Sequence, residues 1–452
     1  MAKKILALFL CALMLLSLAG CADNTVTPPL TEPDVTTTEA TTEATTTEAT
    51  TEEVTTTPEV TTEAATTTEA TTTEAATTTE ATTVTTTEAT TVTTTEPAPE
   101  KSPTAMEVAA GMNLGNNLGN TMEGHYTDGT IYHEWVNVIG SNTPADYENS
   151  WGGGHPTELT IKGMKECGFD TVRIPVYWGN MMENDGTFTI HPDYIARVKE
   201  IADWALDEDM YVVINIHHFD DFVVKRYENE ECAEIFYRVW YQIADYFKNA
   251  PYNLVFEGYN EAMGTNMASR ERTLEESYEL ANMSNQAFVD AVRATGGRNK
   301  DRVLIASGYW TSVDHTTDPM FVMPTDTVED RMMVSVHYID NNMYWSSNVG
   351  NQRWIDHIEE QSEKLDAAFT SKGIPVFLGE TSCIYHDDRM ASDNRIIETS
   401  PECLDHILRR IYDRGYVAVL WTQDSSYYNR ETGEMEEKEH GEVILKLAEE
   451  LR

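Results

Sequence analysis

The sequence predicts a (β/α)8 barrel, the TIM-barrel form of an α/β fold, preceded by a disordered linker rich in Thr and Glu. Three observations lead to this prediction. Eight short apolar runs, each of the length of a buried strand, follow one another after residue 105. Helical patterns separate these runs, and such alternation over roughly 350 residues is typical of a barrel of parallel strands. Polar and aromatic residues stand where most runs end, which is where a barrel carries its functional loops.

The predicted strands are rich in Val, Ile and Phe and are bounded by Gly, Pro or polar residues. In chain order they cover residues 111–115, 169–175, 210–218, 253–261, 302–310, 331–338, 374–380 and 416–421. The first strand has two possible registers, because Asn113-Leu-Gly-Asn is repeated at Asn117-Leu-Gly-Asn. Between the strands, residues 193–206 show the apolar spacing of an amphipathic helix.

Two glutamates end two of these strands. Glu261 closes the run 253–261, and Glu380 closes the run 374–380. A carboxylate at the end of a buried strand is costly unless it has partners or a function. An isolated Asn-Glu pair in this position also serves as a cap of the following helix. Two such glutamates at one rim of a barrel predict the carboxylate pair that a retaining glycosidase requires.

Residues 105–452 resemble glycoside hydrolase family 5, the large cellulase family. Eight stretches carry the resemblance in chain order: Gly111-Met-Asn-Leu-Gly-Asn, Trp151-Gly-Gly-Gly-His-Pro-Thr, Thr171-Val-Arg-Ile-Pro-Val, Ile214-Asn-Ile-His-His, Phe256-Glu-Gly-Tyr-Asn-Glu, Val334-Ser-Val-His, Phe377-Leu-Gly-Glu and Leu420-Trp. The resemblance implies that Glu261 is the acid/base and Glu380 the nucleophile. It also implies that the sugar subsite between them is lined by Arg173, His217, Asn260, His337 and Trp421.

The chemistry independently favours these residue types. One carboxylate must remain ionised to attack the anomeric carbon, and its partner must hold a proton for the leaving oxygen. Arg173 is expected to favour the ionised form of Glu380. Asn260 is expected to bond a sugar 2-hydroxyl, and Trp421 to offer a flat apolar face to a pyranose ring.

The sequence departs from the family pattern after His337. The family usually has His-x-Tyr here, with the tyrosine bonding the nucleophile, but this chain has Ile339 in the tyrosine position. Tyr338 and Tyr344 are the two candidates to replace it, and we include Tyr338 among the predicted substrate-binding residues. The proline that commonly follows Asn-Glu is Ala262 in this chain.

His217 and His218 raise the alternative of a metal site. Adjacent residues of a strand point to opposite faces, so the two side chains are not expected to bind one ion. We therefore predict no metal and no cofactor, and we place His218 with the substrate-binding residues.

The tryptophans divide by their position. Trp178 and Trp310 follow strands, and we expect them to stack on sugars at the functional face. Trp204, Trp240 and Trp354 fall within helical patterns, and we expect them to pack in the core.

The N-terminal region predicts secretion and anchoring. Residues 1–20 combine a basic start with an apolar run, which is typical of a signal peptide. The ending Leu18-Ala-Gly-Cys resembles a bacterial lipobox, which implies cleavage before Cys21 and lipidation of its thiol. An ordinary secretory signal that happens to end in cysteine is the alternative. Residues 21–104 are dominated by Thr, Glu and Ala, so they predict a disordered linker that gives way to the catalytic domain at 105–452.

Charge restricts the partners. The formal net charge of −45 disfavours nucleic acid and anionic surfaces, whereas a neutral polysaccharide is compatible with it. We expect a monomeric, extracellular enzyme, anchored by lipid to the bacterial cell surface, that hydrolyses β-1,4-glucan internally with retention. The same mechanism on β-mannan, xylan, xyloglucan or mixed-linkage glucan is the first alternative. An inactive carbohydrate-binding surface lipoprotein is the second, and the presence of both Glu261 and Glu380 argues against it.

Overall fold

The computed structural model describes residues 101–125, 138–183, 185–261, 272–340, 349–381, 400–422, 428–436 and 438–451. The chain divides into two units, Met1–Pro99 and Glu100–Arg452, and the description concerns the second. The predicted signal peptide, Cys21 and almost all of the predicted linker lie outside the described residues. Among the described helices, none combines the length and apolar character needed to cross a membrane.

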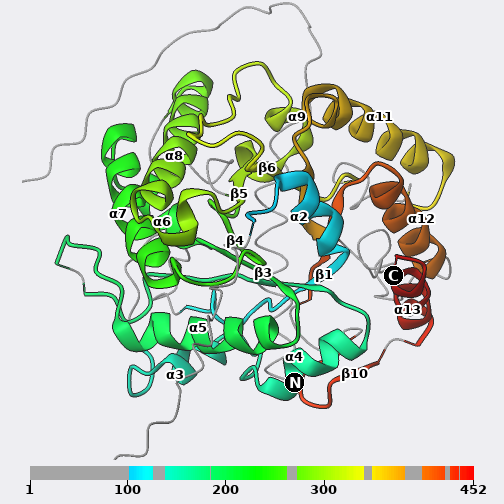
Figure 1. Cartoon of the computed structure of the whole chain (residues 1–452), viewed down its shortest axis with the longest axis horizontal. Coiled ribbons are helices and arrows are strands. Elements are labelled where there is room, and N and C mark those ends of the chain that lie inside the picture. The colour runs from blue at the N-terminus through cyan, green and yellow to red at the C-terminus, as the bar shows by residue number, and fades with distance from the viewer. Residues whose placement is uncertain are drawn as a thin grey trace, which may run out of the picture. The chain divides into compact units, whose positions relative to one another are not determined.

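The second unit is a closed barrel of parallel strands (Figure 1), which confirms the predicted fold class. Each strand pairs with its neighbours in sequence, and the first pairs with the eighth to close the sheet. The strands are β1 (Leu114–Asn117), β2 (Thr171–Ile174), β3 (Tyr211–Asn215), β4 (Leu254–Glu257), β5 (Leu304–Ser307), β6 (Met332–His337), β7 (Val376–Thr381) and β8 (Val417–Leu420).

Side chains alternate between the two faces of the barrel wall. On β3, Val212 and Ile214 pack outward against the helices, while Val213 packs inside the barrel. The same alternation places Val255 of β4 inside. Because both faces are buried, the strands read as continuous apolar runs rather than as alternating patterns.

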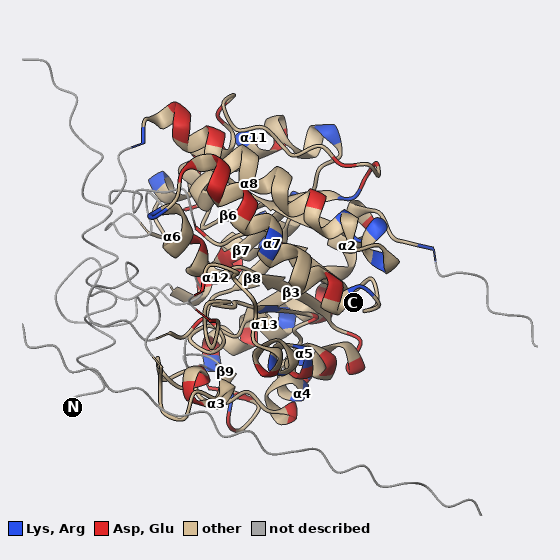
Figure 2. Cartoon of the chain, turned by 90° about the vertical axis from the view of Figure 1, so that its left-hand side faces the viewer, with Lys and Arg blue, Asp and Glu red and all other residues tan. Residues whose placement is uncertain are grey.

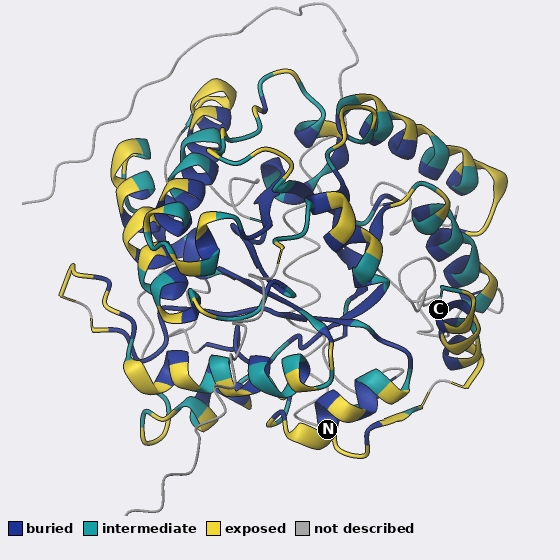
Figure 3. Ribbon diagram, in the orientation of Figure 1, coloured by how far each residue is buried: buried dark blue, intermediate teal, exposed yellow. Residues whose placement is uncertain are grey.

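Helices surround the wall and bury one side each (Figure 3). They are α3 (Pro144–Glu148), α4 (Glu158–Glu166), α5 (Pro192–Asp207), α6 (Phe219–Val224), α7 (Asn229–Phe247), α8 (Leu274–Ala294), α9 (Val313–Thr316), α11 (Gln352–Ala368), α12 (Ser400–Asp413) and α13 (Lys438–Leu451). Helix α5 confirms the amphipathic pattern, with Ile195, Val198 and Ile201 buried. Asp and Glu positions are spread over the outer helices (Figure 2), in keeping with the acidic composition.

The first predicted strand is placed too early. Gly111 and Met112 belong to helix α2 (Ala105–Met112), and the strand starts at Leu114. Helix α2 begins with a capping box formed by Thr104 and Glu107, a local signal that favours helix. Its apolar side contacts residues inside the barrel, so α2 covers the end at which the strands begin. The first copy of the repeated Asn-Leu-Gly-Asn segment supplies most of β1, which ends at Asn117, the first residue of the second copy.

Candidate active site

Glu380 lies near the end of β7, with 8% of its side chain exposed. Arg173 Nη1 donates a hydrogen bond to its Oε1 at 3.1 Å. Its other oxygen, Oε2, lies 3.7 Å from His337 Nδ1 and accepts a long hydrogen bond of 3.5 Å from the Tyr338 hydroxyl. The carboxylate therefore has a polar group beside each oxygen.

Two opposing effects act on the pKa of Glu380. Burial raises the pKa above the ordinary carboxyl value, and this is the largest effect. The neighbouring His337 and Arg173 lower it, while Glu261 raises it further. The net result is a raised pKa, so Glu380 ionises at a higher pH than an exposed glutamate.

Glu261 lies beyond the end of β4 and is more accessible, with 37% of its side chain exposed. Its Oε1 lies 2.9 Å from His337 Nδ1, so one imidazole nitrogen lies beside both carboxylates. Potential ligand atoms of Glu261, His337 and Glu380 lie within 4.8 Å of one another. This proximity agrees with the carboxyl separation of about 5–5.5 Å found in retaining glycosidases and is shorter than that of inverting ones. The carboxylate oxygens that could bind a metal ion in this cluster are also the atoms that hydrolysis would use. We therefore interpret the cluster of Glu261, His337 and Glu380 as a hydrolytic site.

A glycine makes this convergence possible. A Cβ atom added to Gly379, which precedes Glu380, would lie 3.0 Å from both Glu257 Oε1 and His337 Nε2. Such contacts are shorter than ordinary packing allows, so a larger residue would displace these groups.

Arg173 connects the predicted site residues. Fully buried at the end of β2, it donates to Glu380, to Asn117 Oδ1 at 3.0 Å and to Asn260 Oδ1 at 3.0 Å. Its Nε also donates to Glu257 Oε2 at 2.7 Å. The structure thus brings Arg173, Asn260, His337 and both glutamates together, as the sequence predicted.

Glu257 and Asn117 are the residues of this network that sequence reasoning missed. Glu257 occurs in one of the recognised stretches, but no role was given to it. A usable signal was present, because a glutamate as the last residue of the apolar strand β4 needs partners as much as Glu261 does.

The paired histidines adopt a different arrangement from the predicted one. Strand β3 ends at Asn215, and His218 has a left-handed backbone with φ of 62°. The His217 and His218 rings therefore lie close, with centroids 4.4 Å apart, rather than on opposite faces. The argument from strand geometry was wrong for this pair, because neither residue belongs to the strand.

His217 and Trp421 lie side by side, and the charges of Arg173 and His337 act on His217. Their rings are stacked, with centroids 5.9 Å apart and planes inclined by 10°. Burial is the main cause that lowers the pKa of His217 well below its ordinary value, so the ring is neutral at pH 7. Trp421 remains partly exposed, as a sugar platform requires.

The predicted role of Trp178 is wrong. Its side chain has no exposed surface, its indole nitrogen donates to the Asn215 carbonyl at 2.8 Å, and its ring meets Tyr194 edge-on. It packs in the core and cannot stack on a sugar in this conformation. Trp310 is partly exposed and remains a candidate. The predicted core positions of Trp240 and Trp354 are confirmed, whereas Trp204 is only partly buried, under Arg197.

Tyr338, rather than Ile339, contacts Glu380. Ile339 is 1% exposed and packs in the hydrophobic core. Tyr338 has a left-handed backbone, with φ of 39°, and its hydroxyl reaches Glu380. Tyr344, the other candidate, lies outside the described residues.

An aromatic cluster not predicted from the sequence flanks His218. His125 stacks on Tyr177 at 4.1 Å, and the partly exposed Trp151 lies 5.6 Å from His218. Trp151 Nε1 donates to the His125 carbonyl at 2.7 Å. Burial lowers the pKa of His125 to about 4, so this ring is also neutral.

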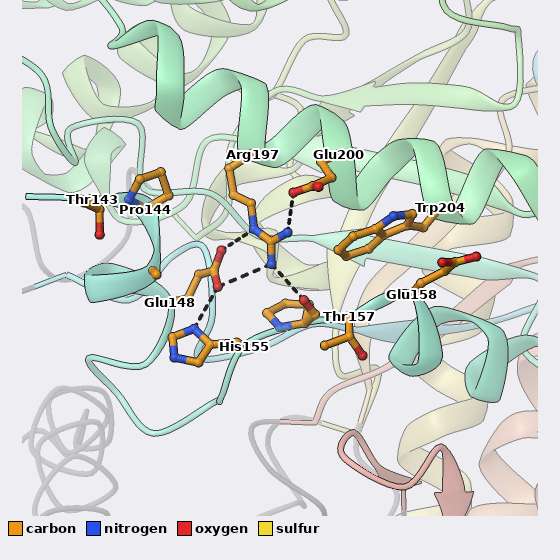
Figure 4. A pocket seen from close by; sticks show the side chains of 11 residues that line it. Thr143, Pro144, Glu148, His155, Thr157, Glu158, Arg197, Glu200 and Trp204 are labelled. Carbon is orange, nitrogen blue, oxygen red and sulfur yellow. Dashed lines mark hydrogen bonds and ion pairs between the residues drawn. The ribbon is translucent and has the colours of Figure 1, made fainter.

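A separate surface pocket of about 560 Å³ lies beside α3, α4 and α5 (Figure 4). Arg197 there forms ion pairs with Glu148 and Glu200, and Glu148 also contacts His155 at 3.0 Å. None of the lining residues belongs to the carboxylate site.

The barrel and its paired carboxylates define a glycoside hydrolase of the cellulase type. The sequence matches the cellulase family, glycosyl hydrolase family 5, over residues 130–425. This match covers more than half of the chain, and the chain belongs to that family.

Relatives with known names agree with this assignment. Endoglucanase B of Ruminococcus albus is 31% identical over 326 residues, which cover 70% of this chain and 72% of that protein. A GH5-4 broad specificity endoglucanase from an uncultured bovine rumen ciliate is structurally similar, with a TM-score of 0.65, 29% identity, and coverage of 77% of this chain and 99% of the other. A Bacteroides ovatus GH5 xyloglucanase, solved in complex with a XXXG heptasaccharide, gives a TM-score of 0.65 and 27% identity, with 77% of each chain covered.

Proposed function

We propose that this protein hydrolyses β-1,4-glucan internally, with retention of configuration, using Glu380 as nucleophile and Glu261 as acid/base. The observation that carries the proposal is the position of His337 Nδ1, 2.9 Å from Glu261 and 3.7 Å from Glu380. This position supports the proposal, because two carboxylates that both lie close to one imidazole nitrogen can act on the same glycosidic bond.

The first half-reaction forms a covalent intermediate. A Glu380 oxygen attacks the anomeric carbon, the bond from that carbon to the glycosidic oxygen breaks, and Glu261 gives its proton to the departing oxygen. Arg173 stabilises the ionised Glu380 before attack. Asn260 is held through its Oδ1 by Arg173, which directs its amide nitrogen to donate to a sugar hydroxyl.

The second half-reaction restores the enzyme. Glu261, now ionised, takes a proton from water, whose oxygen attacks the anomeric carbon and releases Glu380 as a carboxylate. The greater exposure of Glu261 supports this role, because the acid/base must meet both the leaving group and water. Trp421 and His217 provide the wall against which a sugar ring stacks.

Xyloglucan is a second candidate substrate. The similarity to the Bacteroides ovatus xyloglucanase favours it, since its TM-score equals that of the broad specificity endoglucanase. A panel of carboxymethylcellulose, barley β-glucan, xyloglucan, glucomannan and xylan with a reducing-sugar assay tests the proposal. Activity on β-1,4-glucans with a rapid fall in viscosity is expected. If no reducing sugar is released from any member of the panel, the proposed hydrolysis is wrong, and an inactive carbohydrate-binding protein is the better interpretation.

We also propose that the enzyme works at the outer face of the cell, held by lipid on Cys21. The support is the sequence alone: the basic and apolar start, the lipobox-like Leu-Ala-Gly-Cys ending, and the long Thr- and Glu-rich segment that follows. Deleting residues 36–95 should leave activity on soluble glucan unchanged and reduce it only on insoluble substrate, where reach from the surface matters. Equal loss on both substrates would contradict a spacer role.

A further inference from the structure

Glu257 is a second buried carboxylate within the barrel, four residues before Glu261. It is the last residue of β4 and has no exposed surface. Burying an ionised carboxylate is costly unless it is both paired and hydrogen-bonded. The residues that contact Glu257 therefore indicate its role.

Both oxygens of Glu257 are occupied. Oε2 accepts from Arg173 Nε at 2.7 Å and from Asn215 Nδ2 at 3.1 Å. Oε1 accepts from the Ser335 hydroxyl at 2.7 Å. These donors come from β2, β3 and β6, so the carboxylate is held from three strands.

The contact with Arg173 determines where the rest of its guanidinium points. The group is planar, so fixing the Nε–H direction fixes the plane of both terminal nitrogens. Nη1 then meets Glu380 and Asn117, and Nη2 meets Asn260. Without a partner at Nε, rotation about the side chain would separate Arg173 from these residues.

Glu257 and Glu380 share the positive charge of Arg173. One guanidinium forms ion pairs with two buried carboxylates, at 2.7 Å to Glu257 and 3.1 Å to Glu380. Among the described residues, the other ionisable groups that act on Glu380 are His337, Glu261 and Tyr338. Removing the charge of Glu257 would leave Arg173 to act on Glu380 alone.

We propose that Glu257 is a positioning residue for hydrolysis: through Arg173 it orients the guanidinium toward Glu380 and Asn260, and it limits how strongly Arg173 stabilises the ionised nucleophile. This inference rests on the proposed function of Glu380. It predicts that Glu257 affects the rate and its pH dependence without touching substrate.

Glu257→Gln tests the charge with little change of shape. The amide oxygen can keep the bonds from Arg173 and Asn215, and the amide nitrogen can donate to the Ser335 hydroxyl. With the negative charge gone, the acid limb of kcat/KM should move to lower pH by roughly one unit, because Glu380 stays ionised in more acidic solution. At the optimum, kcat should fall about tenfold, since a more strongly stabilised carboxylate attacks less readily, while KM should change less than twofold.

Two further variants separate charge from structure. Ser335→Ala removes one hydrogen bond to Glu257 and keeps its charge, so the acid limb should stay in place. Glu257→Asp also keeps the charge but shortens the reach to Arg173, so the contact of Arg173 with Glu380 should weaken. We expect kcat to fall, and the acid limb not to move to lower pH. A limb that does not move in folded Glu257→Gln, or that moves equally in Ser335→Ala, would overturn the inference. If Glu257→Gln does not fold, an unchanged kcat in Glu257→Asp would overturn it, and a lowered kcat with constant KM would support it.

The activity of the wild-type enzyme on β-glucan distinguishes a failure of the inference about Glu257 from a failure of the proposed function. If the wild-type enzyme hydrolyses no β-glucan, the proposed function itself is wrong. If the wild-type enzyme is active and the variants lower only the melting temperature, the proposed function stands and Glu257 is merely structural.

Discussion

The contact between Tyr338 and Glu380 gives a pH-dependence prediction of definite sign. Tyr338→Phe removes a hydroxyl that lies 3.5 Å from Glu380 Oε2 and leaves the ring in place. The nucleophile must be ionised to attack, so activity falls as the pH drops through its pKa. Removing a donor to the ionised form raises that pKa, and the acid limb should move to higher pH.

The size of the shift follows from the distance. A well-formed hydrogen bond to a charged group contributes about 1.5–3 kcal/mol, with O–H···O distances of about 2.5–3.0 Å. At 3.5 Å we take about half of the lower bound, or about 0.7 kcal/mol. Since one pKa unit corresponds to about 1.4 kcal/mol, the limb should move up by about half a pH unit.

The assay is kcat/KM on a soluble glucan across the acid range, with Ile339→Val as the matched control. Ile339 is 1% exposed and packs in the core, so this change should cost about 0.5–1.5 kcal/mol of stability and leave the limb in place. An unmoved limb in Tyr338→Phe, or an equal shift in Ile339→Val, would refute the reasoning. The burial of Ile339 also shows that Ile339→Tyr would overpack the core rather than restore the family tyrosine.

The remaining predictions concern the catalytic pair, the tryptophans and the anchor. Azide should partly restore turnover of an activated substrate by Glu261→Ala and give a β-azide product, whereas Glu380→Ala should form no such retained product. Product analysis by NMR tests this prediction, and the reverse pattern would exchange the roles of the two glutamates. Trp178→Ala should lower stability by about 3–5 kcal/mol, while Trp421→Ala should raise KM and leave the melting temperature close to that of the wild type. Denaturant unfolding measures the first effect and steady-state kinetics the second. Unchanged stability of Trp178→Ala would contradict the core position of Trp178. Cys21→Ser should release the enzyme into the medium or leave it unprocessed, and equal membrane attachment in cell fractions would exclude lipidation.

The sequence by itself determined the barrel and most of the residues that the structure brings together around Glu380. Eight apolar runs separated by helical patterns can bury both faces of each strand in few other ways than a closed parallel sheet with helices outside. Since all strands of such a sheet point the same way, residues that end them must meet at one rim. Glu261, Glu380, Arg173 and His337 could therefore be predicted to lie together, although they are far apart in the chain.

Only the tertiary structure decided which side chains face the site. Trp178 and Trp421 both follow strands, yet the first is buried against Asn215 and the second stacks on His217, because the backbone path after each strand differs. Tyr338 itself has a left-handed backbone, and its side chain points toward Glu380, while Ile339 packs in the core. Sequence patterns record polarity and spacing but not these backbone turns.

The start of the barrel and the Glu257 contacts also required the three-dimensional structure. The apolar residues near Met112 suit both a strand and a helix. The capping box of Thr104 and Glu107 favours the helix, and the contacts of α2 with the barrel interior show that it covers the end of the barrel. Glu257 looked like one polar residue in an apolar run, because its partners Arg173, Asn215 and Ser335 come from three other strands. A local pattern carries no information about such distant partners, so the network of residues around Glu380 required the closed barrel to be recognised.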